Sequence, residues 1–180
     1  MRVGGFQATN TAIQNPFTFY TVSDNDWSST HNYDYWNKNF TSDPGITNAA
    51  IAKTIYSPSP SGYVEPKTAA YTGITSTGGN TTNGGQFNVT GTFNNGWTIF
   101  TQGWKTGTTL FLKALGFRDS FSGRPSGKLD IYFFNLNYNI WSAGASSTIN
   151  GRSFYTDPSG LYPQYVHGRS YGLNCHSVLE

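Results

Sequence analysis

The side chains best able to do chemistry in this chain lie in two small groups, and the first contains carboxylates. Asp24, Asp26 and Asp34 are close together in the sequence, with His31 among them. Carboxylate oxygens are ligands of hard cations such as Ca²⁺, but the spacing here is not that of a calcium loop. Asp residues in such polar segments mainly cap turns. We therefore predict no metal site at these residues.

The second group lies toward the C-terminal end, where Cys175 and His176 are adjacent and His167 precedes them. A Cys–His dyad requires the two side chains to face each other, whereas neighbouring residues of a strand point to opposite sides of the sheet. Cys175 is the only cysteine, which excludes an internal disulfide and a thiolate metal cluster. The stretch TGGNTTNGG lacks the lysine and the following helix of a phosphate-binding loop. The sequence thus predicts no catalytic residues, no metal and no cofactor.

A third set of side chains fits binding better than catalysis. The chain is rich in Gly, Asn, Ser and Thr and contains 12 Tyr, a composition typical of surfaces that bind through rigid rings and small polar groups. The segment LYPQYVHG contains Pro163 and Gly168 and alternates poorly, so we expect more loop than strand there. Its rings would have little core to enter and would form a binding surface. Large polar-tipped side chains near this end are Tyr162, Gln164, Tyr165, His167, Arg169 and Tyr171.

Charge and hydropathy exclude two classes of partner. Only 11% of the residues are charged, and the Lys and Arg residues are scattered singly, so no basic stripe for nucleic acid exists. No apolar run approaches the ~20 residues that cross a bilayer, so we predict no membrane insertion. The start, MRVGGFQATNTAIQ, lacks the apolar stretch of a signal peptide; a leader has been removed, the chain ends a longer polypeptide, or a carrier delivers it. We divide the chain into an N-terminal arm or linker, residues 1–14, and a ligand-binding domain, residues 15–180.

The elements that must position these side chains are mainly short strands. Two segments are predicted to be helical: residues 43–55, where Pro44 suits a first helical turn, and residues 65–74. The polar segment 75–96 is expected to be a long excursion with one hairpin strand near Phe87–Val89. The predicted fold class is α+β. Aromatic and β-branched runs between turn residues predict strands at 17–22, 53–57, 96–102, 108–117, 128–134, 138–144, 151–157 and 169–179.

Three stretches together resemble one bacterial module. KTIYSPSPSGYVEP (53–66) is similar to its Asp-Pro-Cys-Pro-x-Gly-aromatic-x-Val-Pro motif, LFLKALGFRD (110–119) to a Phe-Leu-Pro-Ala-Ala-Gly-Tyr-Arg strand, and IWSAG with GRSFYTD and GRSYGL (140–173) to its closing motifs. QNPFTFYT and DWSSTHNYDYW resemble the start of the module, so the resemblance extends over residues 13–180. The module is the Fibrobacter-type major paralogous domain, a C-type-lectin-like fold abundant in Bacteroidales that includes variable proteins diversified by retroelements. The resemblance implies a C-type-lectin-like α+β fold with short antiparallel strands, two short helices flanking a small central sheet, and paired N- and C-terminal strands.

The departures from the family pattern concern cysteine. The family cysteine of the first motif is Ser59 here, and the family cysteine near the C-terminus aligns with Ser177. Both are absent together, as the resemblance implies if the two normally form a disulfide. The usual Val-Arg of the last strand is replaced by Cys175 and His176. Formylglycine-generating enzymes share the broader fold but depend on a redox cysteine pair, which one cysteine cannot supply, so we do not expect an enzyme.

The resemblance also implies a ligand-contacting face held on a stable scaffold. In retroelement-diversified proteins mutation falls on adenines, so Asn codons drift to Tyr, Ser, Asp, His, Thr, Ile, Val and Gly, the types found at non-core positions between residues 135 and 171. The implied scaffold residues are Trp141, Arg152, Arg169 and Gly172. The implied ligand-binding residues are Asn137, Tyr138, Asn139, Ser146, Ser147, Thr148, Asn150, Tyr155, Asp157, Tyr162, Gln164, Tyr165, Val166 and His167.

The function predicted in this way is target recognition. The chain would be a receptor-binding or adhesin module with a hypervariable ligand-binding face, displayed on a phage tail fibre or on a bacterial surface or pilus tip. Its partner would be a surface protein or glycan of a bacterial or host cell, and its location extracellular, at the cell surface or on a virion. Low charge and exposed aromatic residues favour display on a larger carrier as a homotrimer, with a free monomer as the alternative. The alternative function is a carbohydrate-binding accessory module of a secreted polysaccharide-degrading system.

Overall fold

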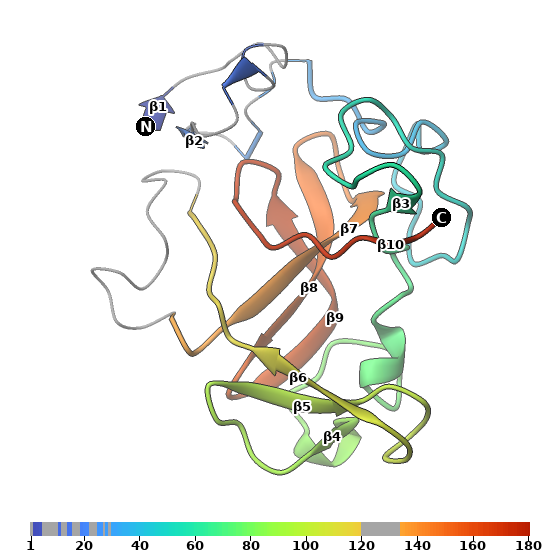
Figure 1. The fold of residues 1–180 in the computed structure, drawn as a ribbon, viewed down its shortest axis with the longest axis vertical. Coiled ribbons are helices and arrows are strands. Elements are labelled where there is room, and N and C mark those ends of the chain that lie inside the picture. Colours follow the sequence, from blue (N-terminus) through green and yellow to red (C-terminus); the bar gives the residue numbers. More distant parts are fainter. Residues whose placement is uncertain are drawn as a thin grey trace.

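Short antiparallel strands in small sheets make up most of the regular structure (Figure 1). The computed structural model describes residues 2–4, 11, 14–15, 19–21, 25–26, 28, 30–119 and 134–180. One three-stranded sheet has the order β4-β5-β6 and the other the order β7-β8-β9. Two further strand pairs are β1 with β2 and β3 with β10. The strands are β1 (Arg2–Gly4), β2 (Phe19–Thr21), β3 (Tyr63–Val64), β4 (Val89–Thr90), β5 (Gly96–Phe100), β6 (Thr109–Lys113), β7 (Tyr138–Ala145), β8 (Asn150–Asp157), β9 (Gly160–Gly168) and β10 (Val178–Leu179).

The two predicted helices do not form, so the predicted α+β, C-type-lectin-like fold class is wrong. Within residues 30–119 and 134–180 the only regular helical segments are two 3-10 turns, η1 (Thr72–Ile74) and η2 (Gly84–Gln86). Of the predicted helix at 65–74, only η1 is present. The described fold is therefore nearly all β.

The predicted helix at 43–55 fails at its first turn. Gly45 has a φ of +65°, a left-handed conformation that a right-handed helix cannot contain. Thr68 then satisfies the local backbone in place of helical bonds: its hydroxyl donates to the Gly45 carbonyl at 2.8 Å and accepts from the Thr47 N–H at 2.8 Å. The segment is an irregular strap tied to the residues that follow β3.

The predicted pairing of the N- and C-terminal strands is also wrong. β1 pairs in parallel with β2, whereas β10 pairs antiparallel with β3. The second of these pairs brings Ser177 to Ser59, whose hydroxyl oxygens lie 2.8 Å apart. These are the two positions at which the family pattern has cysteines and this chain has serines. Of the predicted strand at 169–179, the structure keeps only β10 as a strand, and the predicted strand at 53–57 reduces to a single bridge at Lys53.

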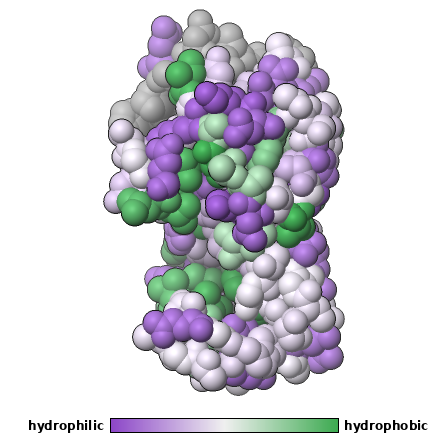
Figure 2. Space-filling model, turned by 90° about the vertical axis from the view of Figure 1, so that its right-hand side faces the viewer, coloured by the Kyte–Doolittle hydropathy of each residue, from purple (hydrophilic) through white to green (hydrophobic). Residues whose placement is uncertain are grey.

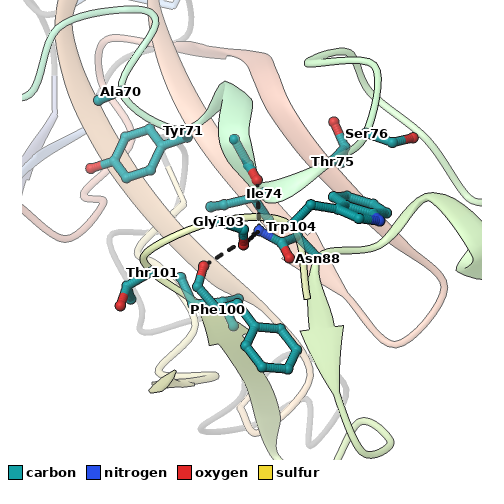
Figure 3. A pocket seen from close by; sticks show the side chains of 12 residues that line it. Ala70, Tyr71, Ile74, Thr75, Ser76, Asn88, Phe100, Thr101, Gly103 and Trp104 are labelled. Atoms are coloured by element: carbon teal, nitrogen blue, oxygen red, sulfur yellow. Dashed lines mark hydrogen bonds between the residues drawn. The ribbon is translucent and has the colours of Figure 1, made fainter. Parts of the chain in front are cut away.

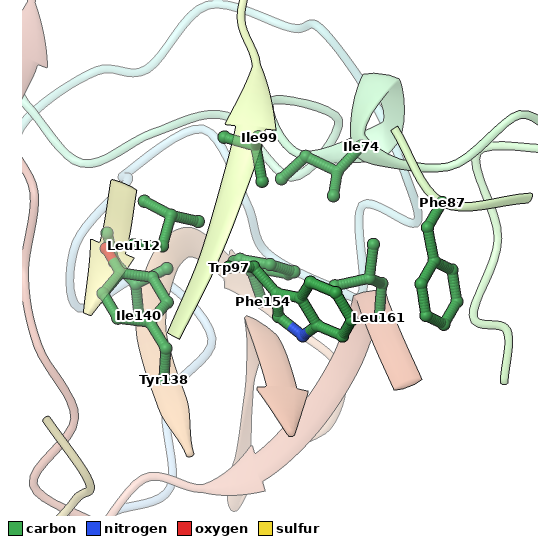
Figure 4. Packing of buried hydrophobic residues seen from close by; sticks show 9 residues of the cluster. All are labelled: Ile74, Phe87, Trp97, Ile99, Leu112, Tyr138, Ile140, Phe154 and Leu161. Atoms are coloured by element: carbon green, nitrogen blue, oxygen red, sulfur yellow. The ribbon is translucent and has the colours of Figure 1, made fainter. Parts of the chain in front are cut away.

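The hydrophobic core draws side chains from both three-stranded sheets and from η1 (Figure 4). Trp97 and Ile99 of β5 meet Ile140 of β7 and Phe154 of β8 in one cluster, and Phe154 is fully buried. The successive side chains of β8 alternate between this core and the opposite face of the sheet. Leu161, Tyr138, Leu112, Phe87 and Ile74 complete the cluster.

Hydrophobic and hydrophilic residues are interspersed on the face that carries the C-terminal end (Figure 2). No helix among the described residues is both long and apolar enough to cross a bilayer. Of the predicted arm, residues 1–14, the structure describes β1 and two further positions, and β1 lies against β2. The predicted strand at 128–134 lies outside the described residues except for its last position.

Candidate functional site

β9 spans the segment that was expected to be mainly loop, so that prediction is wrong. The strand pairs with β8 along its length, but the register shifts in the middle: Ser153 is opposite Tyr165, whereas Tyr155 is opposite Tyr162. β9 therefore carries one extra residue here, a β-bulge that includes Pro163, which has no N–H to donate to the ladder. Without the bulge, residues three apart in a strand would point to opposite faces. With it, Tyr162 and Tyr165 both lie beside Tyr155.

These rings belong to a continuous surface, which we call the aromatic face. The ring centroid of Tyr155 lies 5.2 Å from that of Tyr162 and 4.9 Å from that of Tyr165. Tyr165 in turn lies 4.8 Å from His167. Every ring of the set is partly exposed. The rings therefore pack against one another and still present area to a partner. The aromatic face consists of Tyr155, Tyr162, Tyr165, His167, Tyr171 and Phe117.

His167 lies where most of the rings meet. Its centroid is 5.5 Å from that of Tyr171, 5.8 Å from that of Phe117 and 6.3 Å from that of Trp141. Its Nδ1 is 2.9 Å from the hydroxyl oxygen of Ser153. Burial lowers the pKa of His167 to about 4, because a charged imidazolium would lose its hydration there. The imidazole is therefore neutral at pH 7.

Ser153 and His167 are residue types that can act as a nucleophile and its base, but a substrate has no access to the Ser153 oxygen. Ser153 is only 2% exposed, so a substrate carbonyl could not reach its oxygen. Among the described residues no carboxylate bonds to His167 to orient it, as a catalytic triad requires. The described residues also contain no group of His, Cys, Asp and Glu able to hold a metal ion. The aromatic face offers contact area and neutral hydrogen-bonding groups.

Tyr155 is fixed in place by its hydroxyl. The hydroxyl accepts from Nδ2 of Asn137 at 2.8 Å and donates to Oδ2 of Asp157 at 2.7 Å. Burial raises the pKa of Tyr155, so the phenol stays protonated and remains a donor. The other carboxylate oxygen of Asp157 closes the turn between β8 and β9, accepting from the backbone N–H groups of Ser159 at 2.8 Å and Gly160 at 2.9 Å. Asp157, a predicted ligand contact, thus supports the face from its turn.

β7 and the residue before it are buried, which contradicts the prediction that Asn137, Tyr138 and Asn139 are exposed contacts. Their exposed fractions are 3%, 3% and 0%. The outer edge of β7 is covered by Asn174, whose carbonyl accepts from the Trp141 N–H at 3.0 Å and whose N–H donates to the Asn139 carbonyl at 3.2 Å. Tyr138 points into the core. A covering segment so distant in the sequence cannot be recognised from the Asn-rich strand itself.

Two predicted contacts of β9 point away from the aromatic face. The side chain of Gln164 donates to the Gly78 carbonyl at 2.7 Å, and its backbone N–H donates to Oδ1 of Asn80 at 2.9 Å. Val166 is 41% exposed, but it is opposite Arg152 in the ladder, one position away from His167. Since side chains alternate along a strand, Val166 lies on the other side of the sheet.

The remaining predicted contacts lie at the turn between β7 and β8, at the end of the sheet where His167 is found. The Ser147 hydroxyl accepts from the Asn150 N–H at 3.1 Å, and the Ser147 carbonyl accepts from Nη2 of Arg169 at 2.9 Å. Ser146 closes the turn through its backbone, and Thr148 is exposed. The structure brings this turn near one end of the face and shows no ring contact to it.

The predicted scaffold residue Trp141 is opposite Ser153 in the ladder and lies on the same face of the sheet as His167. Its ring covers Gly151 so closely that a Cβ there would lie 2.7 Å from the indole. The indole packs edge-on against Trp36, with centroids 5.6 Å apart. Trp141 is 4% exposed and its ring packs beside that of His167, so it supports the aromatic face as a buried neighbour. Gly172, another predicted scaffold residue, forms a bridge with Arg118.

The two predicted scaffold arginines each bind a carboxylate. Arg152 holds Asp43 through two nitrogens at 2.7–3.0 Å, which ties the 43–55 strap to β8. Nη1 of Arg169 lies 3.4 Å from Oδ2 of Asp26, whose carboxylate is fully buried and has a raised pKa because of that burial. His31 also lies 3.4 Å from the same oxygen. Asp26 therefore belongs to an ion-pair cluster, while Asp24 lies outside the described residues.

Sequence reasoning missed three residues of the site. Phe117 was assigned to the core as part of an apolar run. It lies between β6 and β7 in the sequence, and its ring packs beside that of His167. Tyr171 was noted for its polar tip but not placed on the face, where it lies 5.7 Å from Phe117. Ser153 carried no signal, because its role is a bond to a residue on the next strand.

No protein-family model, no curated protein and no solved structure matches this chain. The function is therefore inferred from the residues of the aromatic face and from their geometry.

Proposed function

We propose that this protein is a target-recognition module that binds a surface molecule through the aromatic face. The observation that carries the proposal is the continuous set of six partly exposed rings, four of them on β8 and β9 and the other two, Phe117 and Tyr171, packed beside His167. Such rings supply large contact area at a low cost in conformational entropy, and tyrosine is enriched among the residues that dominate binding energy. A contiguous cluster of this kind on a surface marks an interaction site.

The hydrogen-bonding groups of the face favour an uncharged epitope. The phenol hydroxyls of Tyr162, Tyr165 and Tyr171 make no hydrogen bond within the described residues, so they are available to a partner. His167 is neutral at pH 7, and the carboxylate of Asp157 is engaged by Tyr155 and the turn. The partner we propose is a surface protein or a glycan of a bacterial or host cell, bound by ring contacts and hydroxyl hydrogen bonds.

The proposal includes display outside a cell or on a virion, on a larger carrier. It is supported by the low share of charged residues and by the Tyr, Asn, Ser and Gly content, both typical of exposed binding surfaces. The motif resemblance to the Fibrobacter-type major paralogous domain favours the same class of function, although the strand arrangement differs from the one it implied.

The test is binding of the labelled protein to intact bacterial and epithelial cells. We expect Tyr162→Ala/Tyr165→Ala to lose ~2 kcal/mol or more of binding free energy, about thirtyfold in affinity. The matched control is Tyr56→Ala/Tyr63→Ala, which removes two rings that are 40% and 42% exposed elsewhere on the surface. Cell binding that survives the first double substitution, or is lost equally in the second, contradicts the proposal.

A further inference from the structure

A cavity of ≈ 650 Å³ lies between η1 and the loop that follows β5, away from the aromatic face (Figure 3). One of its walls is Tyr71, whose ring stacks on Phe154 with centroids 5.2 Å apart. Phe154 points into the core, so the cavity and the aromatic face lie on opposite sides of β8. The volume is within the range of small-ligand pockets, about 300–1,000 Å³. Residues that line it include Tyr71, Ile74, Ser76, Asn88, Phe100 and Trp104.

The walls combine aromatic rings with neutral polar groups. No residue that lines the cavity carries a charge. Tyr71 and Trp104 lie on opposite sides of it (Figure 3), and Trp104 is 42% exposed. Tyr71 contributes its ring to the wall, and its hydroxyl points away from Trp104 (Figure 3). The Ser76 hydroxyl makes no hydrogen bond within the described residues. The Ser76 hydroxyl can therefore donate to and accept from a ligand.

The cavity is preformed, because one buried amide holds its two walls together. Nδ2 of Asn88 donates to the Gly73 carbonyl of η1 at 2.9 Å and to the Gly103 carbonyl of the loop at 3.1 Å. Its Oδ1 accepts from the Lys105 N–H at 2.6 Å. The ammonium of Lys105 also lies over the indole of Trp104, 5.4 Å from its centroid, and restrains that ring. A pocket fixed in this way binds without a large ordering cost.

We propose that this cavity binds an uncharged sugar ring. A pyranose has an apolar face that stacks on an aromatic ring and hydroxyls that bond to neutral donors and acceptors, which are the two kinds of group found here. A charged ligand would be desolvated among lining residues that carry no charge, since the nearest ammonium, that of Lys105, lies over the indole of Trp104. A purely aliphatic ligand would leave the Ser76 hydroxyl unpaired. The site is independent of the aromatic face, so either can fail in experiment without the other.

The experiment is an NMR titration of the ¹⁵N-labelled protein with methyl glycosides of glucose, galactose, mannose and N-acetylglucosamine, and with sialic acid as the charged comparison. We expect at least one glycoside to shift the indole N–H signal of Trp104 and the amide signal of Gly103 at millimolar concentration, and sialic acid not to do so. Trp104→Ala should weaken that binding about tenfold or more. Tyr63→Ala is the matched control, because Tyr63 is also 42% exposed but lies at β3.

Ser76→Ala gives a second test that does not depend on a large truncation, since Ser76 is exposed and its loss should leave the fold intact. It should weaken the same glycoside about fivefold or more while leaving the melting temperature unchanged. The proposal is overturned if none of the four glycosides binds, if sialic acid binds as well as they do, or if binding survives Trp104→Ala. Shifts confined to the signals of the aromatic face would overturn it as well.

Discussion

Acidification should destabilise the fold through His167. The folded-state pKa of this imidazole is about 4, below its ordinary value of 6.5, because burial disfavours the charged form. The unfolded chain takes up a proton near pH 6.5, whereas the folded protein does so only near pH 4. Stability is therefore fully present above pH 6.5 and is lost as the pH falls from 6.5 toward 4. For these two values the loss is about 2–3 kcal/mol at pH 4.5.

The assay is urea unfolding at pH 7, 6, 5 and 4.5 for the native protein and for His167→Gln. The substitution removes the titrating group. Between pH 7 and 4.5 the unfolding free energy of the variant should therefore fall by about 2–3 kcal/mol less than that of the native protein. The raised pKa of Asp26 acts in the opposite direction, but it is present in both proteins and cancels in the difference. The comparison thus isolates the contribution of one imidazole.

The aromatic rings around His167 could stabilise its charged form, and the opposite pH dependence would then be observed. An imidazolium is attracted to aromatic faces by ~0.5–1 kcal/mol per ring, which opposes the effect of burial. If that attraction dominated, the native protein would gain stability relative to His167→Gln as the pH fell. Equal pH dependence in the two proteins would also contradict the reasoning, because it would mean that His167 has an ordinary pKa.

Three further predictions concern the scaffold. A double-mutant cycle on Asp43 and Arg152, read by thermal unfolding, should give a coupling of about 0.5–1 kcal/mol, since the pair is bidentate but the Asp43 side chain is 38% exposed; no coupling would mean that the strap is held otherwise. Ser59→Cys/Ser177→Cys, in a background without the native cysteine, should form a disulfide, lose both free thiols and stabilise the fold by about 2–4 kcal/mol unless reductant is added; two persistent thiols would contradict the observed proximity. Trp141→Ala should cost about 3–5 kcal/mol in urea unfolding, because the ring is 4% exposed and covers the sheet ladder; a loss below ~1 kcal/mol would refute its supporting role.

The strands of the two main sheets could largely be predicted from the sequence, since each is an aromatic or β-branched run between turn residues. The predicted segments 96–102, 108–117, 138–144 and 151–157 correspond to β5, β6, β7 and β8. The helix at 43–55 could not be excluded from propensity alone, because a single left-handed residue, Gly45, breaks its first turn. Local patterns thus identified most strands that form, but they did not show that the segment 43–55 stays irregular.

The candidate site was harder to predict because its geometry depends on contacts between distant residues. Pro163 and poor alternation indicated a loop, whereas the bulge lets β9 pair with β8 and aligns its tyrosines. The same segment was correctly read as rich in polar-tipped rings. Asn139 has the residue type of an exposed contact, yet Asn174 covers its strand. The chemical types of the side chains in the site could be predicted from the sequence, but their exposure to solvent could not.

Hydroxyl-radical footprinting would show whether the aromatic face is the surface that binds the target. The protein is oxidised free and bound to the cells that it recognises, and the modified tyrosines are read by mass spectrometry. We predict that Tyr162 and Tyr165 are protected in the bound state, while the exposed rings of Tyr56 and Tyr63 are oxidised equally in both. Protection of Tyr56 and Tyr63 with unchanged oxidation of Tyr162 and Tyr165 would contradict the proposed function.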